Sequence, residues 1–153
     1  MRKSTEVKRY LRQIKVINIS LKHKMTEIEE LWKTATDINA VSYDGEKVTA
    51  SRKSTDAGYV NDILRISDLE KKIKDEILRL TEKKHEIISS ILSMENEIYS
   101  HILIMHYVDM KSFEDIAAEK DYSYQYVINL HRKAINAFAE IYCKKDIKND
   151  LSA

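Results

Sequence analysis

The sequence predicts an all-α protein in which two long helices fold back on each other and a cluster of shorter helices follows. The first observation is a scarcity of helix-breaking residues, because the 153 residues include two glycines and no proline and helix interiors disfavour both. The second is a heptad spacing of apolar residues over two long stretches, which is typical of helices that pack in pairs. The third is a series of short segments after residue 95 in which apolar residues recur at helical spacing.

Two heptad stretches define the long helices, the first from about Thr5 to Ile38 and the second from Tyr59 to Met94. The segment "AVSYDGEKVTASRKSTDAG" between them holds both glycines, and its polar composition predicts a loop over about residues 40–58. We therefore expect a long antiparallel, coiled-coil-like helical hairpin over residues 1–94, in which Lys24 lies within a turn of Glu70. The rows are Val7, Ile14, Leu21, Ile28 and Ala35 with Tyr10, Ile17, Leu31 and Ile38, and then Tyr59, Ile66, Ile73, Leu80, Ile87 and Met94 with Ile63, Ile77 and Ile91.

The shorter helices begin at residue 95. "ENEIYSHILIMHYVD" predicts one helix and "FEDIAAEK" a second, with the turn "DMK" between them. Ser112 is an N-cap candidate for the second helix. After the turn "DYS", Ser123 is the N-cap candidate for a last helix that reaches about Tyr142. These elements predict a domain over residues 95–143, followed by a polar tail over residues 144–153.

The spacing around "DYS" is typical of a helix-turn-helix. That motif needs a small residue where its two helices cross, a residue that tolerates a left-handed conformation four positions later, and aliphatic anchors on the second helix. Ala117, Asp121, Val127 and Leu130 stand in those places. Asp suits the turn because Asp and Asn adopt the left-handed region more readily than other non-glycine residues.

The segment "FEDIAAEKDYSYQYVINLHRKAINAF" resembles region 4 of the sigma-70 family of RNA polymerase sigma factors. With the upstream "YVDMKS" and the long hairpin, the chain is similar to small sigma-like proteins encoded by phages and prophages of low-GC Gram-positive bacteria. The pattern is an acidic pair before Ile, a capping Ser, a Val four residues later and a Lys-Ala pair near the end. The matching residues are Glu114, Asp115, Ile116, Ser123, Val127, Leu130, Lys133 and Ala134.

This resemblance implies that the helix starting at Ser123 binds double-stranded, promoter-like DNA, with RNA polymerase as a further partner in the cytoplasm of a bacterial host. Tyr124, Tyr126 and Ile128 stand where sigma factors commonly carry basic residues that grip and read the −35 element. We therefore expect a different DNA target. No stretch resembles the sigma region that melts the −10 element, so a complete stand-alone sigma factor is not expected.

Residue chemistry indicates DNA contact without the resemblance. Gln125 and Asn129 can each make two hydrogen bonds to adenine, and Arg132 can reach guanine or phosphate. Hydroxyls and helix N-terminal amides suit phosphates. The alternative is that the tyrosines pack over the preceding turn and the amides face water. The candidate DNA-binding residues are Ser112, Ser123, Tyr124, Gln125, Tyr126, Ile128, Asn129, Arg132 and Lys133, with Arg9 and Arg12 from the N-terminus.

Charge is distributed unevenly along the chain. Residues 1–24 hold eight Lys or Arg and one Glu, whereas residues 95–153 hold seven basic and ten acidic side chains. An acidic domain repels DNA, because Lys and Arg supply most non-specific affinity. The hairpin would return Lys8, Arg9, Arg12 and Lys15 to this domain and supply the missing charge. Alternatively, a homodimer joined through the hairpin would place two weak readers on two half-sites.

Other kinds of function have little support in the sequence. The single Cys143 cannot form an intramolecular disulfide, no apolar run approaches the length of a membrane span, and the N-terminus lacks an apolar signal core, so we expect a cytoplasmic protein. The five histidines show no metal-ligand spacing, and no catalytic or cofactor motif is present, so neither an enzyme nor a bound cofactor is expected. The sequence predicts a sequence-specific DNA-binding transcription regulator of phage genes. The alternatives are a sigma-like interaction module without direct DNA readout, and a phage DNA-packaging recognition subunit.

Overall fold

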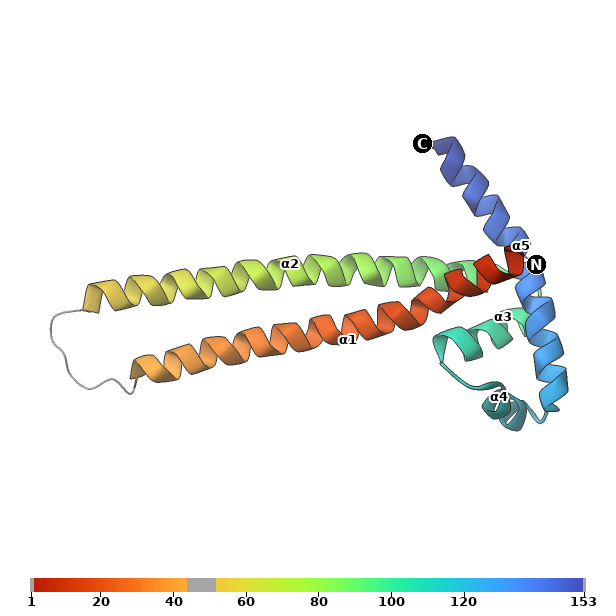
Figure 1. Cartoon of the computed structure of the whole chain (residues 1–153), viewed down its shortest axis with the longest axis horizontal. Coiled ribbons are helices and arrows are strands. Elements are labelled where there is room, and N and C mark those ends of the chain that lie inside the picture. The colour runs from red at the N-terminus through yellow and green to blue at the C-terminus, as the bar shows by residue number, and fades with distance from the viewer. Residues whose placement is uncertain (1, 44–51, 153) are drawn as a thin grey trace. The chain divides into compact units, whose positions relative to one another are not determined.

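The computed structural model describes the backbone of residues 2–43 and 52–152, and their side chains except those of residues 38–43, 52–57 and 150. It is 92% helical, with no strand in these ranges, which confirms the all-α class. The elements are α1 (Arg2–Tyr43), α2 (Arg52–Leu92), α3 (Glu97–Leu103), the π-helical turn η1 (Ile104–Val108), α4 (Phe113–Lys120) and α5 (Tyr124–Ser152) (Figure 1).

No helix in the described ranges combines the length and the apolar character that a membrane crossing requires. The chain divides into two compact units. Unit 1 contains Met1–Asn18 and Glu82–Ala153, and unit 2 contains Ile19–Thr81.

The long helices extend further than the sequence predicted. The expected loop over residues 40–58 is too long, because α1 continues to Tyr43 and α2 already begins at Arg52; residues 44–51 lie outside the described ranges. Gly58 is inside α2, in open space. A glycine in a helix interior costs only about 1 kcal/mol relative to alanine, which is not enough to end a long helix. The last helix also continues to Ser152, ten residues beyond the expected Tyr142.

Unit 1 has a buried apolar core to which the first turns of α1, the end of α2 and the later helices contribute. Phe138 on α5 is fully buried, and the ring of Tyr10 stacks on it with centroids 6.2 Å apart. On α2, Ser90 accepts a hydrogen bond from the Lys145 ammonium of α5. The largest fully buried side chains of this core are Phe138, Leu11, Ile14, Ile87, Ile91, Leu103, Ile116, Ile135, Val7 and Val127.

In unit 2, segments of α1 and α2 lie side by side and run in opposite directions. Lys24 pairs with Glu76 at 2.7 Å, and Trp32, further along α1, lies close enough to Glu70, which is earlier on α2, to help Lys74 lower its pKa. Glu70, which was expected within a turn of Lys24, instead forms its ion pair with Lys74 on its own helix. Glu76 lies six residues after Glu70 on α2, so the position opposite Lys24 is more than one turn from Glu70.

The C-terminal elements pack around a small apolar cluster within unit 1. Ile116 and Ala117 on α4 meet Val127 and Leu130 on α5, and α3 and η1 complete the cluster with Ile102 and Met105. The helix expected over "ENEIYSHILIMHYVD" is in fact α3 followed by the π-helical turn, whose closing Asp109 amide donates to the Ile104 carbonyl. A π-helical turn rotates the side chains that follow it relative to a regular helix.

Candidate functional site

The turn between α4 and α5 has the local geometry that the sequence predicted. Asp121 adopts a left-handed conformation with φ 55° and ψ 37°, and its amide donates to the Ala117 carbonyl at the end of α4. The Ser112 hydroxyl caps α4 by accepting a hydrogen bond from the Asp115 amide at 3.1 Å. The left-handed turn residue and this N-cap are therefore confirmed.

The first turn of α5 is capped in the same way. The Ser123 hydroxyl accepts a hydrogen bond from the Tyr126 amide at 3.2 Å, which satisfies one of the amides that a helix leaves unpaired at its start. Val127 and Leu130 turn inward and are buried, as expected, together with Ala134. The inner face of α5 is thus fixed by packing, and this fixes which side chains face outward.

The outward face of α5 carries most of the predicted contact residues. Gln125, Arg132 and Lys133 are exposed, and Ile128 and Asn129 are half-buried. Asn129 accepts a hydrogen bond at its Oδ1 from the Arg132 guanidinium at 2.8 Å. This bond connects the two side chains on the exposed surface of the helix.

The sequence analysis left two roles open for the tyrosines at the turn, which were contact with DNA and packing over the preceding turn. Tyr126 packs edge-to-face on Tyr122, with centroids 5.0 Å apart, so it does lie over the preceding turn. It nevertheless remains 46% exposed, and Tyr124 is 48% exposed. Both side chains are therefore exposed to solvent.

A buried polar pair on the inner side of α5 was missed by the sequence analysis. The Tyr107 hydroxyl on η1 and His131 Nε2 on α5 form a 2.9 Å hydrogen bond, and both residues are buried. Burial lowers the pKa of His131 to about 4, an effect that nearby His106, Lys8 and Arg12 increase. Burial also raises the pKa of Tyr107 to about 12. His131 follows buried Val127 by four positions, and that spacing was the available signal.

His106 completes an aromatic cluster beneath α5. Its ring stacks on Phe113 of α4 with centroids 4.2 Å apart and meets the ring of His131 edge-on at 5.4 Å. The Nδ1 proton is donated to the Lys111 carbonyl at 2.8 Å, and burial lowers the pKa of His106. Lys111 in turn pairs with Glu119 of α4. These contacts hold η1, α4 and α5 together directly behind the outward face.

The basic N-terminal turns of α1 lie near α5 within unit 1. Lys8 and Arg12 are close enough to His131 to lower its pKa, and Arg9 lowers the pKa of Tyr142, whose raised value results mainly from burial. Arg9 and Arg12 are exposed. The structure therefore brings these predicted residues to the same unit as the outward face of α5, and their role in binding stays a prediction.

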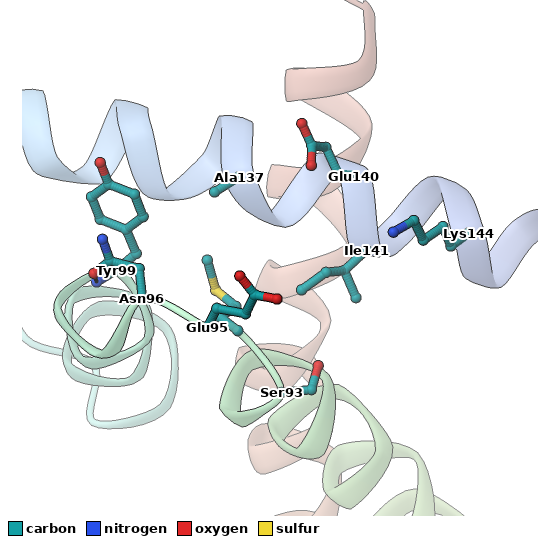
Figure 2. Close-up of a pocket in the computed structure, with 9 residues that line it drawn as sticks. Ser93, Glu95, Asn96, Tyr99, Ala137, Glu140, Ile141 and Lys144 are labelled. Atoms are coloured by element: carbon teal, nitrogen blue, oxygen red, sulfur yellow. Dashed lines mark hydrogen bonds between the residues drawn. The ribbon is translucent and has the colours of Figure 1, made fainter.

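A separate cavity of about 400 Å³ lies where α2 ends and α3 begins, beside the later turns of α5. Figure 2 shows Glu140, Ile141 and Lys144 of α5 opposite Glu95 and Tyr99. None of the candidate DNA-binding residues lines this cavity. Among the described residues, no three His, Cys, Asp or Glu side chains form a group that could hold a metal ion.

No family model, curated protein or solved structure matches this sequence. The likeness to sigma region 4 therefore rests on the residues quoted above, and the local geometry of α4, the turn and α5 is the basis for a proposal about function.

Proposed function

We propose that this chain is a sequence-specific regulator of transcription that binds double-stranded DNA, is encoded by a phage and acts in the cytoplasm of a bacterial host. In this proposal a long helical hairpin precedes a helix-turn-helix domain, and α5 reads the DNA. The observation that carries it is the outward face of α5. Gln125, Asn129 and Arg132 are presented there by a helix whose inner side is fixed by buried Val127 and Leu130.

The polar groups on this face suit base edges in a major groove. Gln125 can donate to adenine N7 and accept from N6, and Asn129 can do the same. The Oδ1 atom of Asn129 has two acceptor sites, so the bond from Arg132 leaves one for a base. The remaining guanidinium donors of Arg132 can reach guanine or a phosphate.

Phosphate contacts would orient the helix on the duplex. Ser123 stands at the start of α5, where free amides and the helix dipole favour an anion. Ser112 at the start of α4 would add a hydroxyl, beside the acidic Glu114 and Asp115. Tyr124 and Lys133 add a hydroxyl and a charge. Arg9 and Arg12 would compensate for the acidic excess of residues 95–153, and this compensation explains why the reading helix can approach a polyanion. A homodimer through the hairpin would place two reading helices on two half-sites.

Direct readout is tested by replacing the two amides. The double change Gln125→Ala, Asn129→Ala should weaken binding to DNA selected by the wild-type chain by about 1–3 kcal/mol per lost bidentate contact. Asn149→Ala, an exposed change further along α5, is the matched control and should leave affinity unchanged. The measurement is a fluorescence anisotropy titration at several salt concentrations. The proposal is contradicted if the DNA affinity does not depend on salt concentration and the double change leaves that affinity unaltered.

Phosphate contact by α1 is tested by charge reversal. Arg9→Glu with Arg12→Glu should weaken binding to every duplex sequence alike and reduce the salt slope by about one per lost phosphate contact. The control pair is Arg65→Glu with Lys72→Glu, which removes the same charge from exposed positions in unit 2. If both pairs have equal effects, net charge rather than local contact explains the change.

A second candidate is an interaction module that binds RNA polymerase or another regulator without reading DNA. The acidic excess of residues 95–153 and the exposed Tyr122, Tyr124 and Tyr126 favour this alternative, since tyrosine is enriched at protein interfaces. Selection of bound fragments from a genomic pool separates the two. Recovery of a shared DNA motif supports readout by α5, and recovery of random fragments favours the interaction module.

A further inference from the structure

The heptad residues along which α1 and α2 pack, here called the seam, are buried to different extents in the two units. In unit 1, Leu11, Ile14, Ile87 and Ile91 are at most 1% exposed, and α5 packs against both helices there through Tyr10 and Ser90. In unit 2, most heptad residues of the same two helices are only half-buried. These residues are Leu21, Ile28, Leu31, Tyr59, Ile63, Ile73, Ile77 and Leu80. Within its described residues, unit 2 contains segments of only these two helices and lacks a third layer.

One side of this half-covered seam carries a tryptophan. Trp32 is 43% exposed, and its side chain lies close enough to Glu70 of α2 to help Lys74 lower the pKa of that carboxyl. Met25 lies seven residues earlier on α1, hence on the same side of the helix, and it is 55% exposed. Trp is enriched among the few residues that contribute most of the binding energy of protein interfaces.

The charges of unit 2 favour a second copy as the occupant. Residues 19–37 and 58–81 carry eight basic and nine acidic side chains, so two copies do not repel each other. Exposed Lys22 and Glu29 lie on either side of Met25, at the three- and four-residue spacing that keeps them on its side of α1. When two such rows meet antiparallel across a twofold axis, Lys22 of each copy meets Glu29 of the other. This face is therefore complementary to itself, as an isologous interface requires.

The size of the surface suits a reversible dimer. With Lys22 of one copy opposite Glu29 of the other, the two α1 segments of unit 2 overlap over residues 19–32, a length of about 21 Å at ~1.5 Å per residue, and two adjacent helices are about 20 Å wide. A contact of that size buries roughly 400 Å² per copy, or on the order of 800 Å² in total, which is in the range of weak, reversible associations.

We propose that Lys22, Met25, Glu29 and Trp32 form a self-association face through which two copies of unit 2 pair about a twofold axis. This inference deepens the homodimer of the proposed function by naming its surface. It holds whether or not the chain binds DNA, because the face lies in unit 2 and the reading helix lies in unit 1.

The test is sedimentation of the full-length chain, without DNA, from low to high micromolar concentration. The wild-type chain of 17.9 kDa should sediment as a dimer. Met25→Ser with Trp32→Ser should raise the dimer dissociation constant at least about 30-fold, because one interface anchor contributes about 2 kcal/mol or more. Val16→Ser removes an apolar side chain that is 63% exposed in unit 1 and should change nothing. A monomeric wild type, or a double variant that dimerises as tightly as wild type, overturns the proposal.

A charge exchange tests the twofold pairing itself. Lys22→Glu alone and Glu29→Lys alone each place like charges together twice and should each weaken the dimer. The double exchange restores opposite charges and should recover most of the lost affinity, a result that general destabilisation of a helix does not produce. If the double exchange is no tighter than the two single changes, the antiparallel pairing is wrong. A wild-type chain that dimerises but does not bind DNA contradicts the proposed function and leaves the self-association face standing.

Discussion

Phe138→Ala should destabilise unit 1 by about 3–5 kcal/mol, the usual cost of removing a buried aromatic side chain. Phe138 is fully buried on α5, and its ring is the stacking partner of Tyr10 on α1. The change therefore removes apolar burial and also the contact that holds the basic N-terminal turns against α5. Domains of this size are commonly stable by only about 5–15 kcal/mol, so a large share of the stability is lost.

The two units allow this effect to be located. Trp32 is the single tryptophan and lies in unit 2, so its fluorescence reports on that unit during urea unfolding. Amide hydrogen exchange in α3 and α5 reports on unit 1. We expect the large loss of protection in α3 and α5. Tyr124→Ala, an exposed aromatic change on the same helix, is the control. A loss below about 1 kcal/mol for Phe138→Ala contradicts the central place of this ring in the core.

Acidification from about pH 7 to about pH 4 should cost unit 1 about 3 kcal/mol through His131. The folded protein holds the pKa of His131 at about 4, below its ordinary value of 6.5. The unfolded chain therefore binds the proton first as the pH falls. The stabilisation is complete above about pH 6.5 and is lost progressively down to about pH 4. The lowered pKa of His106 acts in the same direction.

The comparison of two variants isolates this contribution from that of the carboxylates. His131→Gln keeps a hydrogen-bonding group beside Tyr107 but cannot titrate, so its stability should fall less steeply over this pH range than that of the wild type. His101→Gln removes an exposed histidine of the same unit and should retain the wild-type slope. Equal slopes for all three proteins in urea unfolding would show that His131 protonates as easily in the folded state as in the unfolded state.

His131 also connects stability with the proposed site. It follows Leu130 and precedes Arg132 on α5, and its bond to Tyr107 fixes the side of the helix opposite Gln125 and Asn129. The outward face is thus oriented by a buried polar pair as well as by apolar packing.

Local signals predicted much of the fold and of the candidate site. The scarcity of glycine and proline indicated the all-α class. The caps at Ser112 and Ser123 and the left-handed turn at Asp121 could be predicted because each depends on side chains and backbone within four residues. The helix ends at Tyr43, Arg52 and Ser152 were predicted less well. Polar segments that lack proline can continue a helix that has already formed. Composition alone therefore does not show at which residue such a helix ends.

Features that join distant segments were decided by tertiary structure. The sequence by itself determined that the chain is helical, where heptads supply apolar rows, and which residue makes the turn before α5, because all of these depend on neighbours along one helix. Only the folded structure decided that Lys24 meets Glu76 rather than Glu70, and that Tyr107 and His131, 24 residues apart, share a buried hydrogen bond. The register of two helices and the partner of a buried polar group depend on how whole surfaces pack, and sequence spacing restricts that packing without selecting one solution.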